Sequence, residues 1–281
     1  MSPTERRRTM SITADCHIHS HHSGDSEVPM EDMVKRAIAL GLERICFTEH
    51  QDFDFVYEPG EPKDLFETDT DAYYKELACL REKYKKQIKI LFGIELGLQT
   101  HISDRLDTYA ASYDFDFIIG SSHLCNHKDP YLKSFFEDRS EMSAYREYFS
   151  YINECIAACH NFDVYGHLDY VLRYGPTTNT QFHFKDYQDL IDPILRSLIM
   201  QGKGIELNTS GYAYHLSAPH PCHDILKRYR ELGGEILTIG SDSHKPEQIA
   251  AYFSTAADLL TGCGFTHYCV FEQRKPVFYS L

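Results

Sequence analysis

The stretch DCHIHSHHSGDS, residues 15–26, gathers four histidines and two aspartates within twelve positions. Imidazole nitrogens and carboxylate oxygens suit zinc, manganese or iron in a catalytic setting. His17 and His19 stand two positions apart, so on a β-strand both side chains point to the same face, about 6.5 Å apart along it. That spacing suits two imidazoles that hold one ion. Twelve residues cannot complete such a site alone, so other ligands must come from elsewhere in the chain.

Further His, Asp and Glu residues occupy equivalent positions in the sequence: they stand at the C-terminal ends of strand-like segments. The seven segments carry, in chain order, Asp15, His17 and His19; Glu49 and His50; Glu95; His123; His167 and Asp169; Glu206; and Asp242 and His244. In a barrel of parallel strands these ends converge on one face, where active sites lie. We therefore predict one composite metal site to which all seven strands contribute, with coincidence as the alternative.

The elements that must position these residues alternate along the chain. Strands are expected at 11–19, 43–50, 88–96, 114–123, 162–169, 203–210 and 235–244, and helices at 30–41, 69–87, 140–160, 184–202, 222–234 and 245–264. Repeated β-then-α units predict a parallel sheet, either open or closed into a barrel. No Pro/Gly/Ser-rich spacer divides them, so we expect a single domain over residues 1–281, with 1–10 as a flexible tail.

Composition narrows the classes of function. The formal net charge is −14, from 28 Lys and Arg against 42 Asp and Glu, which argues against a nucleic-acid partner bound through a basic face. A small phosphorylated substrate stays possible, because metal ions and one or two local Arg residues outweigh the global field at short range. Nine cysteines without a CxxC pair indicate reduced thiols and a cytoplasmic location. No apolar run reaches the roughly 20 residues of a membrane span. Composition says nothing of the oligomeric state.

In chain order, the segments DCHIHS, TEH, GIE, GSSH, GHLD, ELN and GSDSH resemble the motifs of the polymerase and histidinol phosphatase (PHP) superfamily. Each motif alone is weak, whereas the ordered set is specific and extends over nearly the whole chain. GHLDYVLRY (166–174), ELNTSG (206–211) and the tail RKPVF are similar to segments of the stand-alone histidinol-phosphatases. The resemblance implies an α/β fold, a distorted seven-stranded (β/α) barrel similar to a TIM barrel.

The resemblance also implies a PHP-type site for three divalent ions, which would be Zn, Mn or Fe. The implied ligands are His17, His19, Glu95 and Asp242 for one ion; Glu95, His123 and His167 for a second; and Asp25, His50 and His244 for a third. Asp25 stands where other members can carry a histidine, which can alter the preferred metal. Four carboxylates are expected to orient the imidazoles, namely Asp15, Glu49, Asp169 and Glu206. His21 and His22 are expected to be solvent-exposed or to support the ligands.

The implied reaction is hydrolysis of L-histidinol phosphate to L-histidinol and phosphate, a step of histidine biosynthesis, with a metal-bridging hydroxide as nucleophile. The residues expected to be catalytic are Glu95, Asp242 and His244. Those expected to bind substrate are Arg173, Asn208 and His215, and the planar fork of Arg173 suits two phosphate oxygens. A basic residue follows the NTSG turn in many relatives, but the matching position here is Ala213.

Two other functions remain open from the sequence. The first is a PHP-family phosphoesterase that acts on nucleotides or other small phosphate esters, because a fold does not fix a substrate. The departure at Ala213 leaves room for it. The second is a non-catalytic, metal-stabilised module. Metal content and a phosphate-release assay would separate the three.

Overall fold

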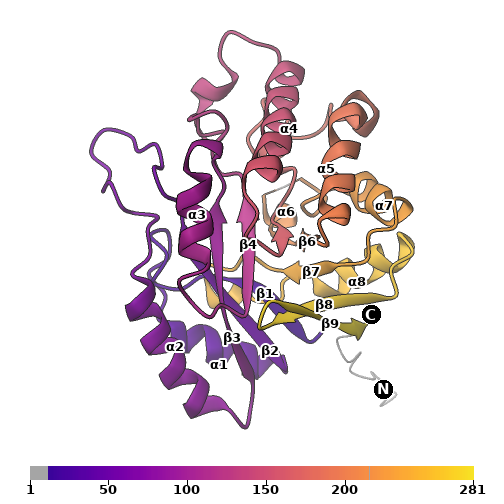
Figure 1. Ribbon diagram of the computed structural model, residues 1–281. Coiled ribbons are helices and arrows are strands. Elements are labelled where there is room, and N and C mark those ends of the chain that lie inside the picture. The colour runs from indigo at the N-terminus through magenta and orange to yellow at the C-terminus, as the bar shows by residue number, and fades with distance from the viewer. Residues whose placement is uncertain (1–11, 215) are drawn as a thin grey trace, which may run out of the picture.

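The structure is a computed structural model that describes residues 12–214 and 216–281, so the expected flexible tail and His215 lie outside the described residues. Seven parallel strands form the central sheet, in the order of the chain (Figure 1). They are β1 (Ala14–Ile18), β2 (Arg44–Gln51), β3 (Lys89–Gly97), β4 (Phe117–Ser121), β5 (Val164–Tyr165), β6 (Gly204–Asn208) and β7 (Leu237–Gly240).

The sheet closes on itself where the chain leaves β7 and passes the end of β1. Ile18 forms a parallel bridge with Ser243. The backbone N–H of His19 donates to the Ser243 carbonyl across 2.8 Å, and Ser243 N donates to the carbonyl of His17 across 3.3 Å. These bonds join the first strand to the end of the last, so the sheet is a nearly closed barrel. The expected α/β barrel of seven strands is confirmed.

Helices surround the barrel (Figure 1). The α-helices are α1 (Met30–Leu40), α2 (Thr70–Tyr84), α3 (Ser103–Ala110), α4 (Glu141–Ala158), α5 (Gln188–Met200), α6 (Ser210–Ala213), α7 (His223–Glu231) and α8 (Phe253–Gly262). The 3₁₀ helices are η1 (Thr100–Ile102), η2 (Lys133–Phe136), η3 (Tyr170–Arg173), η4 (Phe184–Asp186) and η5 (Pro246–Gln248). None of the helices within the described residues is long and apolar enough to cross a membrane.

Helix α1 shows why the periodic segments were predicted well. Its buried side chains are Met30, Met33, Val34 and Ala37, which form one stripe at helical spacing. Gly41 ends the helix with a φ of 80°, a left-handed conformation that glycine adopts without strain. The segment therefore begins and ends where apolar periodicity and a glycine place it.

Two expected elements differ from the structure, and one helix was not expected. The helix expected over 245–264 is broken into η5 and α8, because Ala250 and Tyr252 have positive φ angles of 54° and 61° and Ala250 N donates to the buried Asp15 carboxylate across 2.9 Å. The strand expected over 162–169 keeps only the two residues of β5. Helix α3 was not predicted, since only Leu106 and Ala110 of its eight residues are buried.

A C-terminal hairpin covers the end of the barrel at which the strands begin. Its strands are β8 (His267–Glu272) and β9 (Lys275–Ser280), which pair antiparallel. The Tyr268 hydroxyl accepts from the backbone N–H of Thr13, just before β1, across 3.2 Å. The Phe271 ring stacks on Phe117, the first residue of β4, with centroids 5.2 Å apart. The hairpin thus packs against the starts of strands and leaves their C-terminal ends open.

Candidate metal centre and active site

A cavity of ≈ 320 Å³ lies at the C-terminal ends of the strands. Its inner wall carries side chains from five strand ends, from the loop after β1 and from η3. These are Asp25, His50, Asp52, Glu95, His123, His167, Arg173, Asp242 and His244. His17 and His19 are fully buried and contact this wall from below. The structure therefore brings these residues together at one place, as the sequence predicted.

His17 and His19 bring two imidazole nitrogens face to face. The His17 Nδ1 lies 2.6 Å from Glu206 Oε1. The His19 Nδ1 lies 2.9 Å from Ser23 Oγ. When both Nδ1 atoms carry the proton for these bonds, both Nε2 atoms present lone pairs, and they are only 3.0 Å apart. Two lone pairs at that distance repel one another, so this arrangement favours a proton or a metal cation between them.

Glu95 stands at the centre of the cluster with one oxygen toward each of two imidazole groups. Its Oε2 lies 3.1 Å from His17 Nε2. Its Oε1 lies 2.9 Å from His167 Nε2 and 3.2 Å from His123 Nε2. Burial would raise the pKa of Glu95, but His17 and His123 hold that pKa well below its usual range. The carboxylate is therefore ionised, and its two oxygens face different imidazoles.

Asp52 fixes the orientation of His123. The Asp52 Oδ1 lies 2.6 Å from His123 Nδ1, so the opposite nitrogen of the ring faces Glu95 and His167. Glu206 contacts two ligand residues: its Oε1 faces His17 Nδ1, and its Oε2 accepts from the backbone N–H of His167 across 3.0 Å. Carboxylates of this kind set the tautomer and direction of metal-binding imidazoles.

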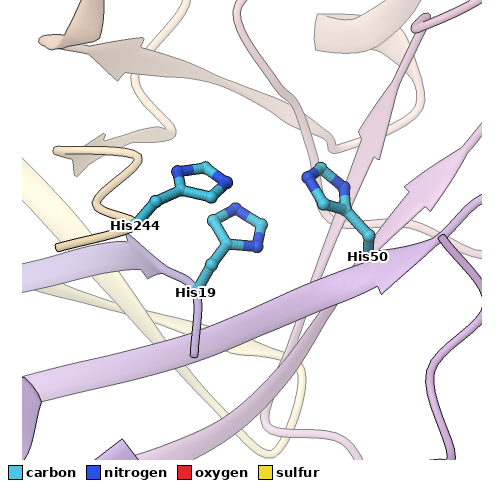
Figure 2. Close-up of side chains that lie close together, drawn as sticks. All are labelled: His19, His50 and His244. Carbon is cyan, nitrogen blue, oxygen red and sulfur yellow. The ribbon is translucent and has the colours of Figure 1, made fainter. Parts of the chain in front are cut away.

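A third group joins His19, His50 and His244, whose rings come from the end of β1, from β2 and from the loop after β7 (Figure 2). The His19 ring centroid lies 4.4 Å from that of His50 and 4.3 Å from that of His244. Asp25 Oδ2 lies 2.9 Å from His244 Nε2 and 3.4 Å from His50 Nε2. Burial, then the neighbouring His244 and His50, lower the pKa of His19 to about 3, so this ring is neutral.

Some buried polar atoms of the cluster lack a well-aligned hydrogen bond, although His50 Nδ1 lies 3.4 Å from Asp52 Oδ2 and 3.2 Å from Glu95 Oε2. His50 Nδ1, Asp52 Oδ2 and His167 Nδ1 are buried and make no hydrogen bond of acceptable geometry within the described residues. Native proteins rarely leave such atoms unpaired without an ion, a water molecule or a functional reason. Three sets of ligand atoms each lie within 4.8 Å of one another: those of His17, His19 and Glu95, those of Glu95, His123 and His167, and those of His19, His50 and His244. This donor set of imidazoles and carboxylates fits divalent ions such as zinc, manganese or iron.

Arg173 adds a fixed positive charge to the cavity wall. Its Nη2 donates to Ser210 Oγ across 2.7 Å and lies 3.8 Å from Asp242 Oδ2. The guanidinium carbon lies 4.0 Å above the Tyr214 ring. Burial opposes the charge, but Tyr174 and Asp242 raise the pKa of Arg173 above its ordinary value, so the side chain stays protonated. The side chain is only 6% exposed, so Arg173 is not a surface residue.

The outer part of the same cavity is acidic and aromatic. Its lining there consists of Phe55, Val56, Glu58, Glu61, Phe66, Asp129, Tyr131 and Leu132. Asp129 is half-buried, and its Oδ1 accepts from the backbone N–H of Tyr131 across 2.7 Å. Burial raises the pKa of Asp129 to about 6. This wall favours a ligand with a positive charge and a flat or apolar body.

One expected substrate contact, Asn208, lies away from the cavity. Asn208 is fully buried and does not line the cavity; its Oδ1 accepts from Ser210 Oγ across 2.6 Å, so it supports the serine that holds Arg173. His215 lies outside the described residues. Ala213, the departure from the family pattern, lines a neighbouring hollow of ≈ 270 Å³ together with Asp25.

The four carboxylates expected to orient imidazoles divide into two pairs. Glu206 binds His17 directly, and Glu49 acts through Ser23, whose Oγ donates to Glu49 Oε2 across 2.6 Å. Asp169 instead pairs with His220 at 2.6 Å, outside the cluster. Asp169 therefore orients an imidazole, but not one of the proposed ligands. Asp15 accepts from the backbone N–H groups of Ser241 and Ala250, and among the described residues it holds backbone rather than an imidazole ring.

Besides the outer wall and Ser23, two further residues of the site had not been expected. Asp52 follows His50 by two positions at the end of β2, a spacing that could have marked it. Ser210, which connects Arg173 to Asn208, carries no signal beyond its place after a strand.

Comparisons with known proteins agree with this geometry. The PHP domain model matches residues 15–210, well over half of the chain. A histidinol-phosphatase of Lactococcus lactis is 34% identical, over 93% of this chain and 95% of its own length. A probable histidinol-phosphatase of Clostridium acetobutylicum is 31% identical, over 95% and 96% of the two chains. The crystal structure of the Lactococcus lactis histidinol phosphate phosphatase with zinc, L-histidinol and phosphate superposes with a TM-score of 0.86, at 33% identity and over 94% and 98% of the two chains. The chain belongs to the PHP domain family, together with these full-length histidinol-phosphatase relatives.

Proposed function

We propose that this protein is a metal-dependent phosphomonoesterase that hydrolyses L-histidinol phosphate to L-histidinol and phosphate, a step of histidine biosynthesis. One observation carries the proposal. A single cavity joins a cluster of imidazoles and carboxylates, a buried arginine and an acidic, aromatic outer wall. The full-length likeness to histidinol-phosphatases, one of them solved with L-histidinol and phosphate, supports the same substrate.

The cluster is proposed to hold about three divalent ions of Zn, Mn or Fe, the borderline metals that its donor set suits. The proposed ligands are His17, His19, Asp25, His50, Glu95, His123, His167, Asp242 and His244. Ions bound there would supply Lewis-acid chemistry, which neutralises phosphate charge and makes a water molecule acidic enough to give a nucleophile near neutral pH. Glu95, Asp242 and His244 are assigned a catalytic role because they would hold these ions in position.

Arg173 is proposed to bind the phosphate group. Its planar fork can give two parallel bonds to phosphate oxygens, and Ser210 and the Tyr214 ring already restrict its movement. A fixed guanidinium loses little side-chain freedom on binding, so more of each bond contributes to affinity. Asn208 contributes indirectly, since it accepts from the Ser210 hydroxyl.

The acidic outer wall favours L-histidinol phosphate over nucleotides. The histidinol part carries an ammonium group and an imidazole, which Glu58, Glu61 and Asp129 would attract. Nucleoside di- and triphosphates and oligonucleotides would instead bring further negative charges to this wall. A small cationic phosphate ester is therefore the partner that suits both parts of the cavity.

Nine free cysteines support a reducing, cytoplasmic location for this activity. The continuous seven-stranded barrel supports a single catalytic domain over the chain.

The test is phosphate release from L-histidinol phosphate, a nucleoside monophosphate and a simple aryl phosphate, compared by kcat/KM. We expect histidinol phosphate to be preferred by at least about tenfold, since site-specific polar contacts discriminate by this much or more. Strong chelation should abolish release, and Zn or Mn should restore it. Equal rates would favour a phosphoesterase of broader range. A metal-loaded protein that releases phosphate from none of the three would be a non-catalytic module.

A further inference from the structure

Three metal-binding side chains lie together outside the cavity, on the loop after β1 and on α2. His21 Nε2 lies 3.3 Å from Glu76 Oε2, and His22 Nε2 lies 3.0 Å from the same oxygen. The two rings stand 4.3 Å apart between centroids. None of the three residues lines the cavity, and none belongs to the ligand set proposed above. We propose that His21, His22 and Glu76 form a separate binding site for a zinc-like divalent ion.

The geometry matches the size of such an ion. Zinc binds imidazole nitrogen and carboxylate oxygen at about 2.0–2.2 Å, so ligand atoms at the corners of a tetrahedron lie roughly 3.4 Å apart. The two measured nitrogen-to-oxygen distances of 3.3 Å and 3.0 Å are close to that edge. Two imidazoles and a carboxylate leave a fourth position for water. The donor set suits zinc, cobalt or nickel and is a poor set for magnesium or calcium, which take oxygen ligands.

The His22 ring, the backbone of the loop and helix α2 are held in place before any ion binds. The His22 side chain is 12% exposed and lies beside the Tyr73 ring, with centroids 5.7 Å apart. The Tyr73 hydroxyl in turn donates to the carbonyls of Phe47 and Gly93, which fixes α2 against the barrel. The backbone N–H of His21 donates to the Val28 carbonyl across 2.9 Å. A site with restricted side chains loses little freedom on binding.

An ion at this site would connect the loop after β1 to α2. The same loop carries His19, Ser23 and Asp25 of the main cluster. We therefore expect the ion to stabilise the loop from its outer side, as a structural site coupled to the catalytic one. Because the site is partly exposed, with His21 40% exposed, its affinity should be lower than that of the buried cluster.

The experiment counts zinc bound by the complete protein. Wild type, Glu76→Gln and His21→Gln are dialysed against the same buffered zinc, and bound metal is measured per chain. His267→Gln, which changes an exposed histidine of β8, is the matched control. We expect both site variants to bind one zinc ion per chain fewer than wild type and the control. Zinc added beyond the amount that fills the main cluster should raise the Tm of wild type more than that of either site variant.

Cobalt provides an independent signal. Cobalt bound at this site should add the visible absorption of one tetrahedral ion to the spectrum of wild type. Glu76→Gln should lack this added absorption, or should bind that cobalt ion at least about tenfold more weakly. Equal zinc counts and equal cobalt spectra in wild type and both site variants would overturn the proposal and leave two ordinary hydrogen bonds from histidine to glutamate. Loss or retention of phosphatase activity does not enter this comparison, so the two proposals fail separately.

Discussion

The carboxylate of Asp52 lies 2.6 Å from Nδ1 of His123, in a contact that joins the end of β2 to the segment after β4. The contact fixes which nitrogen of the ring carries the proton. It leaves His123 Nε2 free to face Glu95 at 3.2 Å. An imidazole held in this way is a better metal ligand, because its tautomer and direction are set in advance.

We predict that Asp52→Asn weakens metal binding by about 10- to 100-fold, the usual cost of removing a carboxylate behind a metal-bound histidine. Activity should recover at high metal concentration, because the ligands themselves are intact. The measurement is phosphate release against buffered free Zn or Mn. Asp54→Asn is the matched control, since Asp54 is exposed and pairs with Arg105 away from the cavity. Equal metal dependence of the two variants would remove Asp52 from the site.

Asp242 is predicted to be needed for catalysis and not for the fold. Its φ angle of 53° is left-handed, a conformation that asparagine tolerates better than alanine does, so Asp242→Asn is the cleaner substitution. The change removes the charge that faces His17 and His19 at 3.7 Å and 3.4 Å. We expect kcat to fall by a factor on the order of 10² or more, because metal ligands act as a unit. We expect little change in Tm.

His123→Ala should behave in the same way, and Asp258→Asn on the exposed side of α8 serves as the control. Circular dichroism and thermal melting would show whether each variant is folded. A folded Asp242→Asn protein with a normal kcat would contradict the role assigned to that carboxylate.

The convergence of the ligands could be predicted from the sequence because it depends on local rules. His17 and His19 share a face through the two-residue period of a strand, and parallel strands carry their C-terminal ends to one side. Those rules place a residue at an edge of the barrel without any knowledge of its partners. They were sufficient to bring His17, Glu95 and His244 to one site.

The partners of these ligands depend on long-range contacts that such rules do not contain. Asp52 meets His123 although 71 positions separate them, and Asp15 takes the backbone N–H of Ala250 across 235 positions. The second contact also explains why one long helix was expected where the structure has two pieces. The outer wall was missed for a similar reason, since residues 55–61 and 129–132 are loops without a hydrophobic period.

Arg173 is predicted to contribute to substrate binding through two parallel hydrogen bonds from its planar guanidinium group as well as through its charge. A charge-assisted bond contributes roughly 1.5–3 kcal/mol, so Arg173→Ala should lower kcat/KM by about 10- to 150-fold. Arg173→Lys should lie between wild type and alanine, because lysine keeps the charge and loses the second bond. Arg146→Ala, at an exposed pair with Asp189 on the outside of the barrel, is the control. A lysine variant with the activity of wild type would show that the fork is not used.

Ala213 offers a converse test of the phosphate pocket. It ends α6, and it lines the hollow that also contains Asp242 and His244. A lysine at this position would bring a positive charge toward the proposed phosphate site. We expect Ala213→Lys to leave kcat/KM for histidinol phosphate unchanged or to raise it. A large fall, in a variant that still binds its metals, would mean that the hollow is needed for another part of the substrate.

Asp129 is predicted to make substrate binding depend on pH. Burial is the main cause that raises its pKa to about 6; the Tyr131 N–H and His123 oppose the shift, and Asp52 and Glu61 add to it. The carboxylate is therefore protonated below about pH 6 and charged above it. Only the charged form attracts the cationic histidinol group, so the KM of wild type should fall as the pH rises through that value.

Asp129→Asn isolates this effect, because the titrations of the substrate and of the metal site are common to both proteins. The wall is partly exposed, so we expect the ratio of the two KM values to be close to one at low pH and to grow to about two- to fivefold at neutral pH. A simple aryl phosphate, which carries no cationic group, should show no such ratio, since it has no positive charge for Asp129 to attract. Asp138→Asn, at an exposed position with a left-handed φ of 56°, is the matched control. A ratio that stays constant between pH 5 and 8, the range that spans this titration, would show that Asp129 does not contact the cationic part of the substrate.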